Sequence, residues 1–381
     1  SFWWPNVPYR AGYRAQLHDL ELTLDGRAGG LWRFGFREFR QVKTSYELNG
    51  VRANLRGDSL TLGMYDRIDY GGGKGDAAHT LPGFLPPSPG NGGWPQAVRN
   101  FQRLNYNVVR VHQEPFSPYM LDVADELGLM LIDESSIRGS ESKQDFVAGR
   151  ANMVSHLRDL VVRDRNHASI VRWSQANEPD ANANGDSIDF QRELYQTIKA
   201  NDGTRPVSID ATSNTYDELA YPDFTVYQHY VNEDGSIGGY TDDVHPREDR
   251  PFGRGEFVWP MDTTFIGFTW FATAIEKMRE KDAAEIRPYA LAAAWASSIP
   301  GVRTTDFLTD SNKPPLYGED NLPDPWSNPQ IQRLQQGAHP VLVADTDYWE
   351  AQKLSDPLGR WPSRPVTLTA GRPATRTLVV F

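Results

Sequence analysis

The chain has 381 residues, of which 39% are hydrophobic and 23% charged, an ordinary balance for a globular protein with one large domain and smaller attached pieces. A formal net charge of −11 argues against nucleic acid as the main partner, because phosphate binding needs a basic surface. The chain has no cysteine, which excludes disulfides and thiolate metal sites and leaves the cellular compartment open.

The hydropathy of the chain does not indicate a membrane span. No apolar run approaches the roughly 20 residues that span a bilayer, so we expect no membrane partner. The chain begins SFWWPNVPYR without Met or signal peptide, and it stops at TRTLVVF within a strand-like pattern. We therefore expect an internal piece of a longer, multidomain protein.

The first part of the chain is predicted to be β-structure. Residues 14–24 alternate between apolar and polar side chains, and residues 31–42 and 46–57 follow with similar patterns. Asn49 and Gly50 form the dipeptide most typical of a tight hairpin turn.

From about Leu55 the pattern changes to short apolar strands separated by helical stretches, which indicates parallel βαβ units. The expected strands cover residues 53–60, 107–113, 129–135, 169–177, 206–211, 224–230, 251–257 and 301–307. The expected helices cover residues 94–104, 117–128, 148–165, 187–201 and 283–298. Eight such strands match the size of a (β/α)8 TIM barrel. A doubly wound sheet is the alternative, but no GxGxxG turn follows the first strand.

Two segments lack this periodicity. Residues 63–94 are rich in Gly and Pro and form an enlarged loop after the first strand, either a lid or pocket wall or a plain surface insertion. After Asp310 comes another Pro-rich stretch, followed by strand-like patterns that indicate the start of a further β domain.

Polar side chains recur at the carboxyl ends of the expected strands, where TIM barrels hold their catalytic groups. They are Arg56, Asp58, Arg110, His112, Asp133, Glu134, Asn177, Glu178, Tyr227, His229, Tyr230 and Glu256. Buried polar groups are costly unless they serve a site, so their recurrence on strand after strand indicates one. We expect Asp133 and Glu134 to be partners of nearby Arg or His rather than catalytic groups.

Glu178 and Glu256 end the fourth and seventh expected strands. Two carboxylates about 5 to 5.5 Å apart hydrolyse glycosidic bonds with retention, one as nucleophile and the other as acid/base. Trp259 follows closely and could form a platform for a sugar ring. The plainer alternatives are a carboxylate in the first turn of a helix for Glu178 and an ion-pair partner of Arg254 for Glu256.

Other chemistries have less support. The histidines on the expected strands are widely separated, and no HExxH spacing is present, so no metal site is predicted. A serine hydrolase of the nucleophile-elbow type would need GxSxG, which the chain lacks. No cofactor is expected.

Nearly the whole chain resembles glycoside hydrolase family 2, which includes β-galactosidases, β-glucuronidases and β-mannosidases. The most specific stretch is RDRNHASIVRWSQANEPD (163–180), which is similar to the family's acid/base signature. NYNVVRVHQEPFSPYMLDVADELGLMLIDE (105–134) and FGFREF with YELNGVRANLRGDS support it. The resemblance implies the C-terminal part of an immunoglobulin-like domain in residues 1–45, the catalytic barrel in 46–312, and a linker with the start of a further β domain in 313–381.

The resemblance also implies roles for individual residues. Glu178 would be the acid/base and Glu256 the nucleophile, Asn177 would bind the sugar 2-hydroxyl, Tyr230 would orient the nucleophile, and Arg110 would keep it ionised. The remaining substrate-binding candidates are Asp58, His112, His229 and Trp259.

The departures from the family pattern bear on substrate and metal. Arg138 and Ser140 stand where β-galactosidases hold Mg²⁺, so that metal is not expected. Asn312 and Lys313 are adjacent, whereas β-glucuronidases use Asn-x-Lys for the substrate carboxylate. We predict a retaining exo-β-glycosidase, β-galactosidase-like in specificity, that acts on a glycoside or oligosaccharide. An endo-acting glycanase and a non-catalytic carbohydrate-binding protein remain the alternatives, and the oligomeric state is open.

Overall fold

The computed structural model describes residues 1–60, 86–87, 89, 92–112, 114–137, 143–177, 179, 185–212, 219, 221, 223–229, 249–256, 275, 278–279, 282–287, 329–345, 370–373, 375 and 378–380. Most of the 63–94 segment lies outside these residues. Among the helices of the described part, none is long and apolar enough to cross a membrane.

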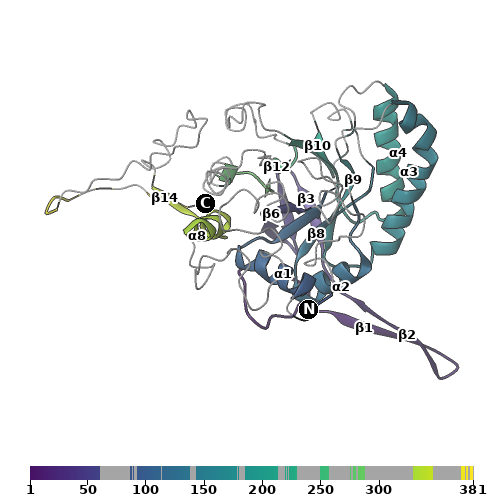
Figure 1. Cartoon of the computed structure of the whole chain (residues 1–381), viewed down its shortest axis with the longest axis horizontal. Coiled ribbons are helices and arrows are strands. Elements are labelled where there is room, and N and C mark those ends of the chain that lie inside the picture. Colours follow the sequence, from purple (N-terminus) through teal and green to yellow (C-terminus); the bar gives the residue numbers. More distant parts are fainter. Residues whose placement is uncertain are drawn as a thin grey trace.

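Eight parallel strands form a closed barrel, as the sequence predicts (Figure 1). In chain order they are β6 (Leu55–Leu60), β7 (Val108–Val111), β8 (Met130–Glu134), β9 (Ile170–Asn177), β10 (Val207–Thr212), β11 (Phe224–His229), β12 (Gly253–Glu256) and β13 (Glu285–Ile286). The ring closes because β13 pairs with both β12 and β6.

The position of the eighth strand differs from the prediction. Residues 283–298 were expected to be a helix and 301–307 the last barrel strand, but β13 occupies that place, and residues 301–307 lie outside the described part. The alanine-rich pattern favours a helix by local propensity. Hydrogen bonds to the neighbouring strands override this propensity. The Leu55 N–H donates to the Ala284 carbonyl at 2.8 Å, and the Arg287 N–H donates to the Arg254 carbonyl at 2.9 Å.

The helices of the first half of the barrel lie where they were expected. They are α1 (Gly93–Arg103), α2 (Pro118–Leu127), α3 (Lys143–Asp164) and α4 (Gly185–Asn201). The limits of α2 follow from local chemistry: the Ser117 hydroxyl accepts a hydrogen bond from the Met120 N–H at 3.3 Å, and Pro118 fits the first turn. Gly128 ends α2 with a φ of 72°, which favours glycine.

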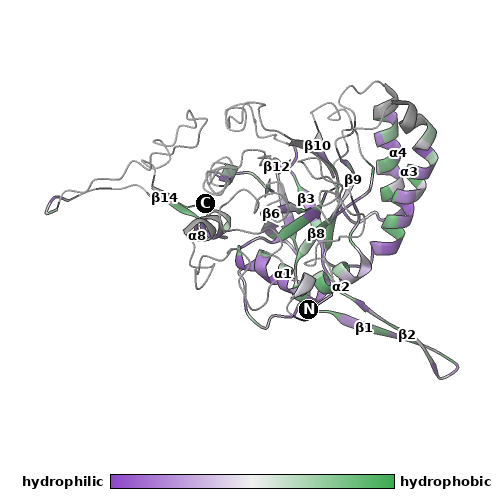
Figure 2. Ribbon diagram, viewed as in Figure 1, coloured by the Kyte–Doolittle hydropathy of each residue, from purple (hydrophilic) through white to green (hydrophobic). Residues whose placement is uncertain are grey.

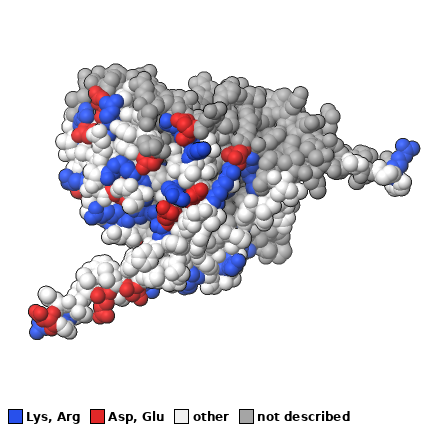
Figure 3. Space-filling view, turned by 180° about the vertical axis from the view of Figure 1, so that it is seen from behind, with Lys and Arg blue, Asp and Glu red and all other residues white. Residues whose placement is uncertain are grey.

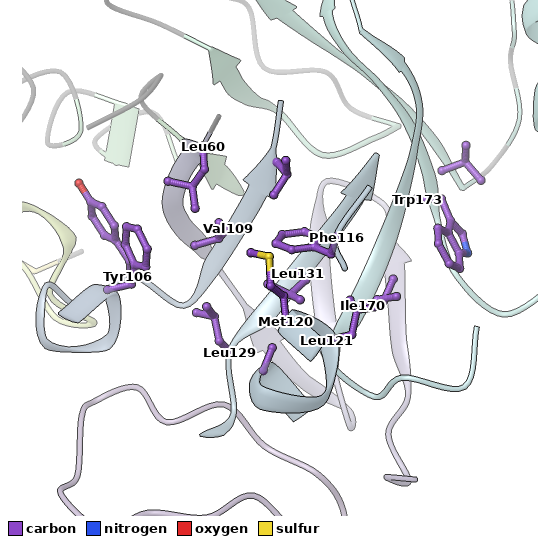
Figure 4. Packing of buried hydrophobic residues seen from close by; sticks show 14 of the residues in the cluster. Leu60, Tyr106, Val109, Phe116, Met120, Leu121, Leu129, Leu131, Ile170 and Trp173 are labelled. Carbon is purple, nitrogen blue, oxygen red and sulfur yellow. The ribbon is translucent and has the colours of Figure 1, made fainter. Parts of the chain in front are cut away.

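The main hydrophobic core lies between the strands and these helices. Figure 4 shows Val109, Leu131 and Ile170 from the strands meeting Met120 and Leu121 of α2. Each of these side chains is almost fully buried, a state worth roughly 1.5–3 kcal/mol per side chain relative to exposure. Figure 2 shows hydrophilic and hydrophobic residues alternating around α3 and α4, as expected of helices with one buried face.

Residues 18–53 form β-structure, within the region where it was predicted. Strands β1 (His18–Leu24) and β2 (Arg27–Phe34) pair as a hairpin that projects away from the barrel (Figure 1). Strands β3 (Phe39–Val42), β4 (Ser45–Leu48) and β5 (Val51–Ala53) form a small antiparallel sheet. The Asn49–Gly50 turn that joins β4 to β5 has positive φ at both residues, 53° and 78°, which confirms the predicted tight turn.

This small sheet closes the N-terminal end of the barrel. Phe39, Tyr46 and Trp3 form a second apolar cluster with residues at the starts of the barrel strands, such as Val108 and Met130. The sheet spans residues 39–53, on both sides of the expected boundary after residue 45. The division into domains and the immunoglobulin-like assignment remain predictions.

The C-terminal part adds α8 (Pro329–Ala338) and the antiparallel pair of β14 (Val343–Asp345) and β15 (Leu378–Val380). Helix α8 was not expected from the sequence. It packs on the barrel through Gln335, whose carbonyl accepts from Asn105 Nδ2 at 2.9 Å and whose Nε2 donates to the Arg103 carbonyl at 2.8 Å. On the face seen in Figure 3, cationic and anionic side chains of the described residues are interspersed.

Candidate active site

The interior of the barrel is polar near the carboxyl ends of the strands. Side chains alternate along each strand, so the polar residues between outward apolar ones point inwards. On β7, Val109 and Val111 belong to the outer core, so Arg110 between them points into the barrel, and His112 follows on the same side. On β6 the alternation places Ser59 inside. All the inward polar groups named here are almost completely buried.

Arg110 organises one part of this interior. Its guanidinium binds Glu134 through two hydrogen bonds, of 2.7 Å from Nε and 2.8 Å from Nη2. The Ser174 hydroxyl donates to the same carboxylate at 2.6 Å. Arg110 Nη2 also donates to Asn177 Oδ1 at 2.5 Å and lies 3.4 Å from His112 Nδ1. Three of the predicted substrate-binding residues, Arg110, His112 and Asn177, therefore lie together, and Glu134 is an arginine partner as expected.

A β-bulge turns Asn177 into the barrel. Ser208 of β10 is in register with Ser174, but Asp210 is in register with Asn177, so β9 contains one extra residue between these pairs. Gln175 faces outwards and donates to the Gln191 carbonyl of α4 at 2.9 Å, and the extra residue leaves Ala176 in the outer core as well. Without the bulge, simple alternation would leave Asn177 on the outer face.

The segment after β8 stabilises this bulge. The Ser135 hydroxyl donates to the Gln175 carbonyl at 2.6 Å, and the Asn177 N–H donates to the Ile137 carbonyl at 2.9 Å. Because the guanidinium of Arg110 can only donate, the carboxamide must present its oxygen to Arg110 and its nitrogen elsewhere. Asn177 Nδ2 is buried and has no hydrogen-bond acceptor among the described residues.

A second set of buried charges links strands on opposite sides of the ring. Arg172 of β9 pairs with Glu285 of β13 through both carboxylate oxygens, one of them at 2.8 Å from Nη2. Arg287 pairs with the same Glu285 and with Asp210 of β10. Arg172 Nη1 also donates to the Tyr46 hydroxyl at 3.1 Å, which connects this set to the small N-terminal sheet.

The arginines keep the two carboxylates ionised. Burial alone would raise the pKa of Asp210, but the charges of Arg287, Arg110 and Arg172 outweigh burial and hold the pKa well below its ordinary value. Burial acts on Glu285 in the same way, and the charges of Arg172 and Arg287 lower its pKa. The sequence interpretation did not include Arg172, Asp210, Glu285 or Arg287. Their signal was present as polar residues at alternate positions within apolar strands.

The two predicted catalytic carboxylates follow the strands that were expected to deliver them. Glu178 comes directly after β9, which ends at Asn177, and itself lies outside the described residues. Glu256 is the last residue of β12, in register with His229 of β11, and its side chain is not described. Tyr230 and Trp259 lie outside the described residues.

The structure does not bring Asp58 to the other candidates. Asp58 alternates with the inward Ser59 and shares its face of β6 with Leu60 of the outer core. Burial, and then the charge of Asp58, raise the pKa of Tyr106, which also belongs to the outer core. Alternation along β6 therefore separates Asp58 from Arg110, His112 and Asn177. Among the described residues, no group of three or more His, Asp or Glu side chains could hold a metal ion.

Asp133 points out of the barrel as well. Its Oδ1 accepts from the Phe116 N–H at 3.1 Å, and its carboxyl group faces Asp164 at the end of α3. Burial, and then Asp164, raise the pKa of Asp133 well above its ordinary value. Arg163 binds both oxygens of Asp164 at 2.6 Å, and its charge acts on the pKa of Asp133 in the opposite direction, lowering it.

Known proteins share this barrel. The model of the TIM barrel domain of glycosyl hydrolases family 2 matches residues 95–298, which is more than half of the chain. Among solved structures, a family 2 member from Bacteroides cellulosilyticus has a TM-score of 0.60 at 17% identity, covering 91% of this chain and 40% of that one. Beta-glucuronidase 3 from Bacteroides uniformis has a TM-score of 0.59 at 17% identity, covering 91% of this chain and 45% of that one.

Several curated relatives of the chain are beta-glucuronidases. The protein from Canis lupus familiaris is 27% identical over 233 residues, which are 58% of this chain and 32% of the relative. The protein from Chlorocebus aethiops is 32% identical over 224 residues, 56% of this chain and 31% of the relative. The chain thus spans about a third of the length of the curated relatives it matches. These comparisons confirm the resemblance seen in the sequence: the chain belongs to glycosyl hydrolases family 2 and contains that family's TIM barrel domain.

Proposed function

We propose that the protein is a retaining exo-β-glycosidase, with Glu178 as acid/base and Glu256 as nucleophile. The observation that supports the proposal is the closed ring of family 2 type, whose fourth strand immediately precedes Glu178 and whose seventh strand includes Glu256. Glu178 follows the fourth strand, β9, and Glu256 ends the seventh, β12. The carboxyl ends of parallel barrel strands share one face, which is where TIM-barrel enzymes hold their catalytic groups.

The proposed reaction is a double displacement. Glu256 attacks the anomeric carbon while Glu178 gives its proton to the departing glycosidic oxygen, which breaks the C–O bond and leaves a glycosyl ester on Glu256. Glu178 then takes a proton from water, and the hydroxide attacks the same carbon and releases Glu256 as a carboxylate. Two inversions give overall retention of configuration.

Asn177 has a positioning and binding role in this mechanism. The contact with Arg110 fixes the carboxamide, and its Nδ2 has no acceptor in the described part of the chain. A sugar hydroxyl next to the anomeric carbon is a suitable acceptor, because it would satisfy a buried donor that is costly to leave unpaired. Such a contact also strengthens as the sugar approaches the transition state.

The substrate follows less directly from the chain. The β-galactoside specificity that we expected from the sequence has no support among the curated relatives above, which are beta-glucuronidases. Their names favour a terminal β-glucuronide as the first substrate to test. The adjacent Asn312 and Lys313, in place of Asn-x-Lys, favour instead a neutral sugar without a carboxylate. Both sugars therefore belong in the same panel.

The first experiment measures hydrolysis of aryl β-D-glucuronide, β-D-galactoside, β-D-mannoside and β-D-glucoside. We expect turnover of one of these aryl glycosides with retention of configuration, and NMR of the released sugar measures that configuration. Activity on a polysaccharide without activity on any aryl glycoside would identify an endo-acting glycanase. Sugar binding without hydrolysis would identify a non-catalytic protein.

The second experiment separates the roles of the two carboxylates. Glu256→Ala and Glu178→Ala should each lower kcat by at least about 10³-fold. Azide should restore activity in both variants and give products of opposite configuration: the α-glycosyl azide with Glu256→Ala and the β-glycosyl azide with Glu178→Ala. Glu193→Gln, a change at a partly exposed glutamate of α4 that pairs with Arg150, should leave kcat unchanged. Wild-type activity of either alanine variant would refute the assignment.

A further inference from the structure

Strand β12 contains a bulge immediately before its last residue. Gln228 of β11 is in register with Arg254, and His229 is in register with Glu256, so Gly255 is an extra residue in β12. Both strands that lead to a predicted catalytic carboxylate thus contain a bulge near the end, since β9 has one before Asn177. A bulge re-aims the side chain that follows it.

The carbonyl of Gly255 is bound by two side chains inside the barrel. The Ser59 hydroxyl of β6 donates to this carbonyl at 2.9 Å, and Arg287 Nη1 donates to it at 3.2 Å. Arg287 Nη1 also donates to Ser59 Oγ at 2.8 Å, so the two groups support each other. A buried carbonyl without a partner is costly, and these contacts stabilise the bulged conformation.

Arg287 is itself held on two further sides. Its Nε donates to Glu285, its Nη2 donates to Asp210, and all three side chains are buried. Glu285 is held in turn by Arg172. The guanidinium therefore has little freedom to move. Because it is bound to residues of β10 and β13, it holds the backbone of β12 in a fixed position relative to these strands.

We propose that Arg287 and Ser59 are positioning residues that fix the Gly255 bulge and thereby aim Glu256. This inference rests on the proposed function, in which Glu256 is the nucleophile. Neither side chain touches the sugar in this role. Their effect is on the attack step, because a displacement of about 1 Å of a reacting group can lower a rate by about 100-fold.

The test measures how fast Glu256 is trapped covalently in the full-length protein. The probes are the 2-deoxy-2-fluoro-β-D-glycosyl fluorides of glucuronic acid and galactose, and the label is located by mass spectrometry of peptides. The variants are Ser59→Ala, which removes one hydrogen bond, and Arg287→Lys, which keeps the charge and loses the guanidinium fork. Ser169→Ala is the matched control, because Ser169 is a buried serine that precedes β9 and its hydroxyl has no hydrogen-bond partner among the described residues.

We expect the trapping rate constant at saturating probe to fall about 10-fold in Ser59→Ala and about 100-fold in Arg287→Lys. The apparent dissociation constant of the probe should stay within about twofold of wild type, because the contacts with the sugar are retained. A loss of stability alone would lower the fraction of active protein and would leave the rate constant of the active fraction unchanged. Ser169→Ala should match wild type in both constants.

The two hypotheses fail in different ways. If wild-type protein is labelled at Glu256 and Ser59→Ala reacts at the wild-type rate, the inference is overturned and the proposed function stands. If wild-type protein is labelled at another residue, or not at all by a probe whose aryl glycoside it hydrolyses, the assignment of Glu256 is overturned. Should Arg287→Lys not fold, the rate of Ser59→Ala decides the inference by itself.

Discussion

The outer and inner faces of the barrel strands are stabilised by different physics. The outer face packs Val109, Leu131 and Ile170 against helices, in a cluster where one apolar side chain can replace another of similar volume. The inner face holds Arg172, Glu285 and other charged groups that are completely buried and must be paired one by one. The outer face therefore requires only apolar side chains of suitable volume, whereas the inner face requires particular charged partners and so fixes how individual strands are placed.

The largest effect is expected from breaking an inner pair. Arg172→Met leaves Glu285 buried with one arginine fewer, and the free energy of unfolding should fall by about 3–5 kcal/mol. The measurement is chemical denaturation followed by fluorescence. The double variant Arg172→Met/Glu285→Leu removes both charges and should recover most of this loss. A loss below about 1 kcal/mol in the single variant would show that the pair is not essential to the inner face.

A smaller effect is expected on the outer face. Leu131→Ala removes a fully buried side chain from the main core, and the free energy of unfolding should fall by about 2–4 kcal/mol through lost burial and a residual cavity. Leu131→Met should cost less than about 1.5 kcal/mol, because its volume is similar. If Met is as damaging as Ala in the same denaturation experiment, the outer face requires a particular side-chain shape and not only a similar volume.

The smallest effect is a gain, at the buried acid pair outside the barrel. Asp133 has a raised pKa, so its contribution to stability is fully present below the pKa of the unfolded chain and is lost as pH rises through the folded pKa. Asp133→Asn keeps the acceptor for Phe116 and supplies a permanent donor towards Asp164. We expect it to stabilise the protein by about 1 kcal/mol at alkaline pH, the energy of one buried hydrogen bond.

The pH dependence distinguishes this mechanism from a general change in charge. The difference in unfolding free energy between Asp133→Asn and wild type should shrink as pH falls from the folded pKa of Asp133 towards 4, because the folded protein takes up the proton first and the unfolded chain takes it up only near its ordinary, lower pKa. Asp159→Asn, at an exposed position on α3, should show no such trend. A constant difference from pH 4 to 8 would mean that Asp133 does not titrate in the folded protein as its surroundings indicate.

Much of the fold was predictable from local patterns. Apolar runs bounded by turn residues gave seven of the eight barrel strands, and helix limits such as Ser117 and Gly128 follow from side-chain and backbone chemistry. The eighth strand was not predictable, because residues 283–298 have helical composition. Only pairing with β12 and β6 makes a strand of Glu285–Ile286.

The candidate site was predictable in part, for a related reason. Strand-end polarity correctly grouped Arg110, His112 and Asn177, which the structure brings together. It did not separate Asp58 and Asp133 from them, because neighbouring residues at a strand end face opposite sides and the pattern does not say which.

The sequence by itself determined the kind of barrel and the order of its strands through the first seven, and it predicted a carboxylate directly after the fourth strand and another at the end of the seventh. These follow from periodicity and from motifs, which are local properties of the chain. The tertiary structure alone decided which polar groups face inwards, since the bulges before Asn177 and Glu256 shift the register of their strands. It also decided that Arg287 meets Gly255 and Asp210, because closing the ring brings together residues that are 32 and 77 positions apart.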